Sequence, residues 1–313
     1  MAESSETHIL PQSFRAGYVA VLGLPNAGKS TLMNQLLEYK LSIVTRKPQT
    51  TRKSVLGILN EEGYQAVFID TPGIIKPRYD LQEAMMGFVK TAIDDADVIV
   101  YLVDVKDRRQ KPEDVKEQLA AAKGKQVILA LNKVDLIDKK QVLPLITQYN
   151  DMYPFRAVIP ISGLKNKGLD ILLEEMLACL PFSPPYYPTD YISDQQERFF
   201  VAEIIREKIF KLYAKEIPYS CHVEIEEFRE AGPASGDQPE RKKDYIRAII
   251  YVEKKSQKGI LIGKQGLALR KVGEFAREDI EVFLDRPVFL EMFVKVAADW
   301  RKKEAMLKIM GYQ

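Results

Sequence analysis

The stretch that decides the fold is YVAVLGLPNAGKST, residues 18–31. Residues 18–23 are mostly apolar and predict a buried β-strand, and a helical pattern begins directly after the motif that ends at Ser30. Gly23 and Gly28 allow a tight turn between the two elements, in which backbone N–H groups point at phosphate oxygens. Lys29 would reach the β- and γ-phosphates, and the hydroxyl of Ser30 is a suitable Mg²⁺ ligand. The stretch therefore predicts a phosphate-binding loop.

Further strand candidates recur through the first 180 residues, separated by longer amphipathic stretches. They are rich in Val, Ile and Leu, as expected of strands buried on both faces. The candidates are residues 18–23, 66–70, 97–104, 126–132 and 157–162, with 54–59 as an added edge strand. This alternation predicts an α/β domain with a mostly parallel sheet wrapped by helices.

A second phosphate motif, DTPG at residues 70–73, ends the strand candidate 66–70. It is expected at the same carboxyl edge of the sheet as the phosphate-binding loop. Asp70 would hold Mg²⁺, either directly or through water. The N–H of Gly73 would bond the γ-phosphate and release it after hydrolysis, which predicts a nucleotide-dependent switch.

Base selection is predicted at NKVD, residues 132–135, which ends the strand candidate 126–132. Asp135 can accept hydrogen bonds from N1–H and the exocyclic amine of guanine, whereas adenine has no matching pair of donors. Lys133 can lay its aliphatic stem over the base. SGLK, residues 162–165, would close over the base through backbone N–H groups. The motifs favour guanine nucleotides, GTP and GDP.

A proline cluster separates this domain from a second one. We expect the first domain at 15–180, a Pro-rich linker at 181–191, a second domain at 192–300 and a basic helical tail at 301–313. The second domain has the order helix, strand, strand, helix, helix, strand, which predicts an α+β fold.

The second domain contains G-x-x-G at Gly263 to Gly266, which we expect after an apolar strand and before a helix. Two glycines let the backbone approach a phosphate closely, and Lys264 adds charge at that turn. Residues 241–277 hold eleven Lys or Arg against three acids. The order of elements and this basic excess match a type II KH domain. Apolar residues around the turn would form a groove for bases: Leu261, Ile262, Leu267 and Val272.

Net charge and composition exclude several classes of protein. A net charge of +2 predicts a local nucleic-acid surface in place of bulk attraction to polyanions. Cys179 and Cys221 cannot form a disulfide framework, and the two histidines carry no metal-site spacing, so no metal cluster is expected. The first residues do not read as a secretory signal and no stretch is long enough to span a membrane. These features predict a cytoplasmic location.

The four nucleotide motifs, in this order, resemble the TRAFAC-class GTPases. KPQTTRKS, residues 47–54, together with GLPNAGKS and DTPG, resembles the Era family of bacterial ribosome-assembly GTPases. Residues 259–277 and 300–312 resemble the KH segment and the C-terminus of that family. The resemblance implies hydrolysis of GTP to GDP, binding of small-subunit (16S) ribosomal RNA near its 3′ end, and a role in assembly of the 30S subunit.

The resemblance also implies roles in hydrolysis. Residues 47–54 correspond to switch I, where Thr51 would be a Mg²⁺ ligand, with Thr50 as an open alternative. Ile74 follows DTPG where Ras-like switches have a water-orienting glutamine. Family members with an apolar residue here and an asparagine at the position of Asn26 often use K⁺ near the β- and γ-phosphates. Asn26 would ligate that ion, and the alternative that it only supports the turn stays open.

The residues expected to act are as follows. Catalytic roles are expected for Asn26, Lys29 and Thr51. Mg²⁺ ligands are expected at Ser30, Thr51 and Asp70. Residues expected to contact GTP are Gly23, Leu24, Pro25, Asn26, Ala27, Gly28, Lys29, Ser30, Thr31, Asp70, Thr71, Pro72, Gly73, Ile74, Asn132, Lys133, Val134, Asp135, Ser162, Gly163 and Leu164. Residues expected to contact RNA are Ile262, Gly263, Lys264, Gln265, Gly266, Leu267, Arg270 and Lys271.

Two rival functions stay open. A P-loop phosphotransferase, such as an ATP-dependent RNA kinase, is opposed by NKVD. A GTPase whose second domain docks to a protein or to the membrane surface is the other. The tail is basic and contains Trp300 and Met306, which leaves open a weak peripheral contact with the inner face of the cell membrane.

Overall fold

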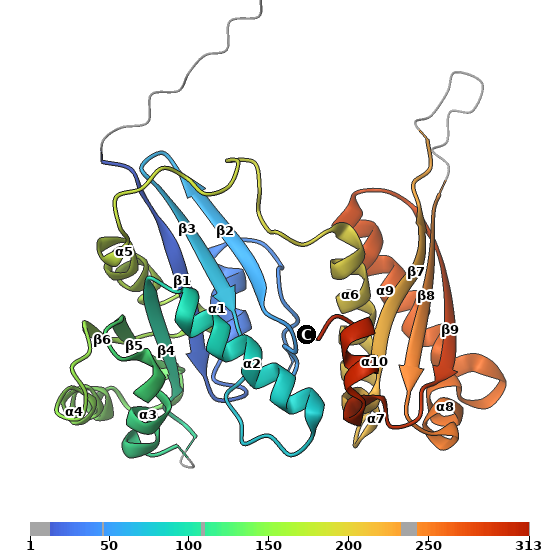
Figure 1. Ribbon diagram of the computed structural model, residues 1–313, viewed down its shortest axis with the longest axis horizontal. Helices are drawn as coiled ribbons and strands as arrows, with labels where there is room; N and C mark the ends of the chain where they lie inside the picture. The colour runs from blue at the N-terminus through green and yellow to red at the C-terminus, as the bar shows by residue number, and fades with distance from the viewer. Residues whose placement is uncertain (1–12, 46, 108–109, 233–242, 313) are drawn as a thin grey trace, which may run out of the picture. The chain divides into compact units, whose positions relative to one another are not determined.

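The computed structural model describes residues 13–45, 47–107, 110–232 and 243–312 (Figure 1). The described chain divides into two compact units. The first comprises residues up to 41, 54–74 and 88–194, and the second comprises 42–53, 75–87 and the chain from 195 onward. The segments 42–53 and 75–87, which we expected within the first domain, therefore group with the second unit.

The first unit is built on a six-stranded sheet with the strand order β2-β3-β1-β4-β5-β6 (Figure 1). All neighbouring strands are parallel except β2 and β3, which are antiparallel. The position of β2 at one edge confirms the predicted edge strand. The strands are β1 (Arg15–Gly23), β2 (Val55–Glu61), β3 (Tyr64–Asp70), β4 (Val98–Asp104), β5 (Gln126–Asn132) and β6 (Ala157–Pro160).

Helices connect these strands, and the buried Val, Ile and Leu side chains of the central strands form the core. Helix α5 packs on β4, β5 and β6, burying Leu169, Leu172 and Met176. The predicted α/β class with its mostly parallel sheet is confirmed. The helices are α1 (Lys29–Leu36), α2 (Asp80–Asp95), α3 (Pro112–Gln118), α4 (Lys139–Asn150) and α5 (Leu169–Cys179), with short 3₁₀ turns η1 (Ala120–Ala122), η2 (Val134–Leu136) and η3 (Gly163–Lys165).

The proline-rich segment after α5 is anchored to the first unit. The ring of Tyr186 stacks on Tyr18 with centroids 5.4 Å apart. Further along, the carbonyl of Ile192 accepts a hydrogen bond from the N–H of Ile58 in β2, with an N···O distance of 3.0 Å. The segment is thus held against the sheet by specific contacts as far as residue 194.

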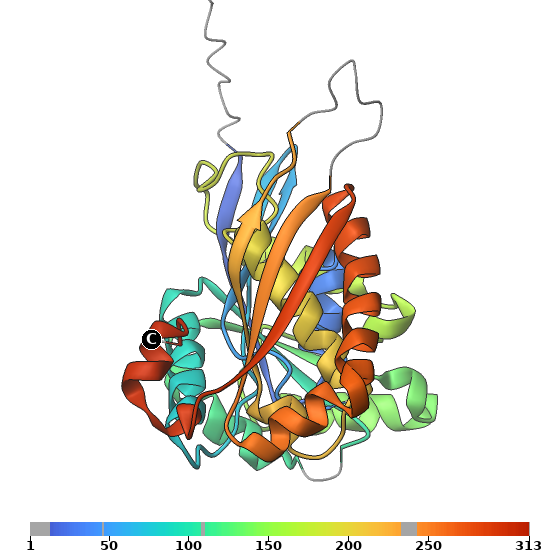
Figure 2. The same cartoon turned by 90° about the vertical axis from the view of Figure 1, so that its right-hand side faces the viewer.

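The second unit contains a three-stranded sheet, in the order β7-β8-β9, with helices α6 and α9 packed on it (Figure 2). β7 and β8 are antiparallel, whereas β8 and β9 are parallel. The elements are α6 (Glu197–Leu212), α7 (Ile217–Ser220), β7 (His222–Arg229), β8 (Asp244–Val252), α8 (Lys255–Ile262), η4 (Lys264–Gly266), α9 (Leu267–Leu284), β9 (Val288–Val296), η5 (Trp300–Lys302) and α10 (Glu304–Ile309). This arrangement confirms the predicted KH fold.

One local expectation in this unit was wrong. The residues before Gly263 form helix α8 and not a strand. The side chain of Gln257 accepts hydrogen bonds from the N–H groups of Glu253 and Lys254, at 2.9 and 3.0 Å, and so fixes the start of the helix. Leu261 then points into the core while Ile260 is exposed. A short apolar run carries too little periodicity to distinguish a helix end from a strand.

The basic tail is partly buried in the second unit. Trp300 is fully buried, and its Nε1 donates to the carbonyl of Ser220 at 2.9 Å. Its ring also stacks on Tyr312, with centroids 6.0 Å apart. Trp300 and Leu307 are thus buried, whereas Ile309 is 73% exposed. Across the ranges described, none of the helices combines the length and apolarity needed to cross a membrane.

Candidate nucleotide site and GxxG turn

The phosphate-binding loop leaves the carboxyl end of β1 and enters α1. Gly23 has φ 144° and Gly28 has φ 104°, so both adopt backbone conformations that other residues rarely take. A Cβ on Gly23 would lie 2.5 Å from the carbonyl oxygen of Leu102, and one on Gly28 would lie 2.3 Å from Nδ2 of Asn132. The two glycines are therefore required both by conformation and by close packing.

The side chain of Lys29 folds back over the loop. Its Nζ donates to the carbonyl oxygens of Gly23 and Leu24, at 3.1 Å each. Burial lowers the pKa of Lys29 to about 8, although the nearby carboxylate of Asp70 opposes the change. Phosphate oxygens are better partners than carbonyls for this ammonium because their charge restores its proton affinity. The position suits the predicted contact with the β- and γ-phosphates.

Ser30 and Asp70, two of the predicted Mg²⁺ ligands, lie together. Oγ of Ser30 donates to Oδ2 of Asp70 at 3.0 Å, which joins the first turn of α1 to the end of β3. Hard oxygen donors of this kind suit Mg²⁺, which binds through one or two protein groups together with water and nucleotide phosphate. The hydroxyl of Thr71 donates to the carbonyl of Val21 at 2.7 Å and holds DTPG beside β1. The donor set therefore fits the ion.

Gly73 packs directly on the phosphate-binding loop. A Cβ there would lie 2.7 Å from the backbone nitrogen of Pro25. The N–H of Ile74 donates to the carbonyl of Gly23 at 3.0 Å. Gly73 and Ile74 are thus held against the loop that would bind the phosphates. The apolar side chain of Ile74 can neither donate nor accept a hydrogen bond and so cannot orient an attacking water.

Asn132 connects three segments of the site. Its Nδ2 donates to the carbonyl of Ala27 at 2.8 Å. Its Oδ1 accepts from the N–H of Lys133 at 2.8 Å and from the N–H of Gly163 at 3.0 Å. One buried side chain therefore fixes the phosphate-binding loop, NKVD and SGLK relative to one another.

The remaining residues expected at the base site lie around Asn132. Lys133 has φ 66°, and its Nζ donates to the carbonyl of Asn26 at 2.7 Å and to Oδ2 of Asp104 at 2.6 Å. Asp135 is exposed in η2, where it is open to a base. The hydroxyl oxygen of Ser162 accepts from the N–H of Lys165 at 3.3 Å and shapes the SGLK turn.

Asp104 is a site residue that sequence reasoning missed. It ends β4 at the same edge of the sheet as Asp70 and Asn132, and its pair with Lys133 fixes the lysine over the loop. A strand-ending aspartate at the carboxyl edge was the available signal, but no motif surrounds it.

The structure groups Thr50 and Thr51 with the second unit and not with Ser30 and Asp70. Arg52, which follows them, is buried and donates to the carbonyls of Pro218, Tyr219 and Cys221 at 3.0, 2.9 and 2.6 Å. The carbonyl of Thr50 accepts from Arg206. The roles of Thr50 and Thr51 as Mg²⁺ ligands stay predictions.

The G-x-x-G turn has the conformation that its glycines allow. Gly263, Gln265 and Gly266 have φ values of 72°, 51° and 77°. A Cβ on Gly263 would lie 2.6 Å from Cβ of Ala268. Lys264 and Gln265 are exposed, and α9 begins directly after the turn. The turn therefore presents its backbone and one cation to solvent at the start of a helix.

The predicted apolar groove is only partly correct. Leu267 is 59% exposed and Ile262 is half-buried, so both remain beside the turn. Leu261 and Val272 are fully buried in the core of the second unit and cannot contact a base. Helical periodicity places Val272 there, since α9 buries every fourth residue from Val272 to Leu284. Arg270 and Lys271 are exposed on α9, where Arg270 pairs with Glu274 at 3.0 Å.

Comparisons with known proteins agree with this geometry. A family model described as 50S ribosome-binding GTPase matches residues 18–133, and a KH domain model matches residues 216–301. The GTPase Era of Geotalea uraniireducens is 43% identical over 302 residues, which cover 96% of this chain and 99% of that protein. The GTPase Era of Geobacter metallireducens is 44% identical over 305 residues, with 96% and 98% covered.

Two solved structures are similar over nearly the whole chain. One is a single-substitution variant of Aquifex aeolicus Era bound to GDP and AlF4⁻, and the other is Era in complex with MgGDPNP and nucleotides 1506–1542 of 16S ribosomal RNA. Each has a TM-score of 0.88 and 38% identity, covering 96% of this chain and 99% of the other. By its motifs, its two folds and this full-length similarity, the chain belongs to the Era family of GTPases.

Proposed function

We propose that the chain is a GTP-hydrolysing switch that binds 16S ribosomal RNA near its 3′ end and acts in assembly of the 30S subunit. The observation that carries the proposal is that one chain contains two ligand sites. One is the guanine-nucleotide site organised by Asn132, and the other is the exposed G-x-x-G turn. The Era relative solved with MgGDPNP and a 16S fragment supports the pairing of the two ligands.

At the nucleotide site, the loop from Gly23 to Ser30 would hold the β- and γ-phosphates through backbone N–H groups and the ammonium of Lys29. Ser30 and Asp70 would hold Mg²⁺, which neutralises phosphate charge that develops during transfer. Asp135 would select guanine. Because Ile74 cannot orient water, catalysis depends on charge stabilisation, and K⁺ held by Asn26 would supply it.

Residues 50–52 join the two functions. Thr51 or Thr50 is expected to report the γ-phosphate through Mg²⁺, while the adjacent Arg52 is bonded to three carbonyls of the second unit. A change in the backbone at Thr51 is therefore transmitted to those bonds through a single peptide link. This connectivity supports the proposal that the conformation of the RNA-binding unit depends on the bound nucleotide.

At the RNA site, the G-x-x-G backbone and Lys264 would contact phosphates, and Leu267 and Ile262 would contact bases. In the rival in which the tail docks on a membrane surface, the buried Trp300 and Leu307 could not take part, so that rival depends on the exposed Ile309 and lysines of the tail. A cytoplasmic location fits a ribosome-assembly role.

The test is filter binding of a synthetic RNA that carries the 3′ end of 16S ribosomal RNA. Lys264→Glu should weaken binding at least tenfold, whereas Lys308→Glu, an exposed lysine of the tail, should change it less than threefold. Gly263→Asp should abolish binding, but steric conflict with Ala268 also strains the turn, so the lysine variant carries the test. Equal loss in both lysine variants would refute the assignment.

Liposome flotation and nucleotide competition separate the rivals. The full chain should stay with soluble protein when mixed with vesicles that contain anionic lipid, and flotation that Lys264→Glu leaves unchanged would favour the membrane rival. Competition of a fluorescent GDP by ATP should fail at concentrations where GTP succeeds. Effective ATP competition would favour the phosphotransferase.

A further inference from the structure

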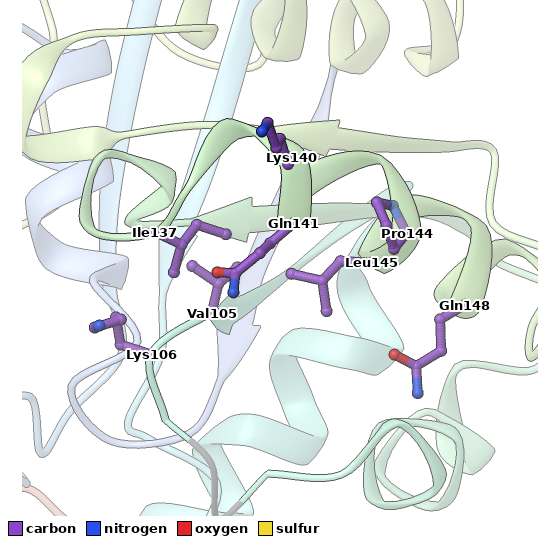
Figure 3. A pocket seen from close by; sticks show the side chains of 8 residues that line it. All are labelled: Val105, Lys106, Ile137, Lys140, Gln141, Pro144, Leu145 and Gln148. Carbon is purple, nitrogen blue, oxygen red and sulfur yellow. The ribbon is translucent and has the colours of Figure 1, made fainter.

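Two cavities of the first unit differ in the charges around them. One lies between the segment after β4 and one face of α4, with a volume of about 560 Å³ (Figure 3). Its lining contains Lys106 and Lys140. Carboxylates lie beside both, since Asp104 and Asp138 accept hydrogen bonds from the N–H groups of these two lysines. Charges of both signs therefore flank this cavity, and they select no class of ligand.

The other cavity lies between the sheet and α2. Its volume is about 530 Å³, within the range of pockets that bind small molecules. The strands β1, β2 and β3 and the end of the proline-rich segment contribute to its walls, and every lining residue belongs to the first unit. The wall from α2 has the spacing of one helix face, i, i+3, i+4 and i+7, and consists of Phe88, Thr91, Ala92 and Asp95.

Most of this lining is apolar. The sheet contributes Leu56 and Ile69, and α2 contributes Phe88 and Ala92. Ile69 and Ala92 are buried, whereas Leu56 and Phe88 are half-buried beside the cavity. Apolar walls of this kind favour an occupant with an apolar body and disfavour a hydrated metal ion.

The charged lining residues are both acidic, Asp95 and Asp194. Among the described residues that line the cavity, none is Lys, Arg or His. Oδ1 of Asp194 accepts a hydrogen bond from the N–H of Leu56 at 3.3 Å, which holds this carboxylate against the wall. Burial and the hydrogen bond with Tyr187 raise the pKa of Tyr18 well above its usual range, so its phenol adds no charge.

Basic side chains close to the cavity in the chain or at the end of α2 do not line it. Lys90 follows Phe88 by two residues, which places it on the other side of α2. Nζ of Lys125 donates to two carbonyls at the end of α2, at 2.8 Å each. Nζ of Lys53 donates to a carbonyl of the second unit at 2.8 Å. The lining is therefore negatively charged as a whole.

Three of the lining residues stand where the chain passes between the two units. Ser54 and Phe88 each begin a stretch of the first unit, and Asp194 ends its last stretch. Each is joined to the second unit by a single peptide link. Oγ of Ser54 also donates to the carbonyl of Asp70 at 3.3 Å, which ties this wall to the end of β3. A ligand in the cavity would thus contact three crossings of the chain at once.

We propose that this cavity binds an organic cation, an ammonium or guanidinium group on an apolar body, and that binding restrains the crossings at Ser54, Phe88 and Asp194. The body packs between α2 and the sheet, and the cation meets the carboxylates of Asp95 and Asp194. A free amine and the side chain of a lysine or arginine in a partner protein share this chemistry. None of the lining residues belongs to the expected GTP or RNA contacts, so the inference is independent of the proposed function.

A matched set of three small molecules tests the charge preference on the full chain. Phenethylamine, phenethyl alcohol and hydrocinnamate have similar apolar bodies and are positive, neutral and negative at pH 7. In surface plasmon resonance, the amine should bind at least tenfold tighter than the other two. Asp95→Asn, Asp194→Asn should weaken binding of the amine at least tenfold, while the asparagine at 194 can still accept from the N–H of Leu56.

Two further variants control for charge and for shape, and circular dichroism checks that each is folded. Asp94→Asn, Asp190→Asn removes two exposed carboxylates from the same two segments, neither of which lines the cavity. Affinity for the amine should change less than threefold in this control. Thr91→Trp alters no charge but fills part of the cavity, and it should weaken binding at least tenfold.

Hydrogen exchange and blocked peptides complete the test. Saturating phenethylamine should slow amide exchange in residues 54–57, 88–92 and 192–195 and leave α4 unchanged. Terminally blocked Leu-Lys-Leu and Leu-Arg-Leu identify the source of the cation. Tighter binding of a peptide than of phenethylamine would assign the site to a partner protein, and weaker binding would assign it to a free amine.

Three results would overturn the proposal. The first is that the amine shows no saturable binding, or binds no tighter than the alcohol. The second is an affinity for the amine that the double variant retains, or that the control pair loses equally. The third is binding that leaves amide exchange at the three crossings unchanged.

Discussion

Replacing Asn132 with alanine tests whether one buried side chain organises the nucleotide site. The side chain is 3% exposed and makes hydrogen bonds to Ala27, Lys133 and Gly163. Alanine leaves the carbonyl of Ala27 and the N–H of Gly163 buried without their partner. Each such group costs about 1–3 kcal/mol, so the two together cost about 2–6 kcal/mol.

Because both groups belong to loops that would contact the nucleotide, we expect at least about 2 kcal/mol to appear as lost binding energy. That corresponds to GDP binding weakened about 30-fold. The assay is titration with a fluorescent GDP analogue, with circular dichroism to confirm that the variant is folded. Asn150→Ala, an exposed asparagine at the end of α4, is the matched control and should bind normally. A folded Asn132→Ala protein with GDP affinity within threefold of the unsubstituted chain would refute the reasoning.

Three other predictions concern the same site. Asp135→Asn should weaken GTP binding and favour xanthosine nucleotides, because the new amide can donate to the C2 carbonyl of xanthine; competition titrations that still prefer GTP would contradict this. GTP hydrolysis should be faster in potassium than in sodium at equal ionic strength, and Asn26→Ala should reduce the difference; equal rates in a phosphate-release assay would remove the K⁺ assignment. Burial lowers the pKa of Lys29 to about 8 and phosphate should raise it, so GDP binding at pH 9 should take up a proton, while little uptake is expected at pH 7. Calorimetry at pH 9 in two buffers of different ionisation enthalpy measures this uptake, and identical heats would count against it.

Much of the fold was predictable because its signals are local. The strands of the first unit are runs of Val, Ile and Leu buried on both faces, such as 98–103 in β4. The phosphate-binding loop is a contiguous motif whose two glycines are required by backbone conformation. In the second unit, the long periodic helices α6 and α9 were also predictable.

The errors have a common physical cause, which is that tertiary packing decides what a short segment does. Leu261 lies in a three-residue apolar run, and only its contact with the core of the second unit identifies the run as the end of α8. The burial of Trp300 against Ser220 is likewise a long-range contact that the composition of the tail does not predict. The pair of Asp104 and Lys133 joins the ends of two strands and has no signature along the chain.

The proposed role depends on binding of small-subunit ribosomal RNA through the G-x-x-G turn. Crosslinking of the chain to RNA in cells, followed by sequencing of the bound fragments, tests it most directly. We expect fragments concentrated at the 3′ end of 16S ribosomal RNA and depleted when Lys264→Glu replaces the unsubstituted chain. Fragments spread over unrelated RNAs, or an unchanged pattern in that variant, would contradict the account.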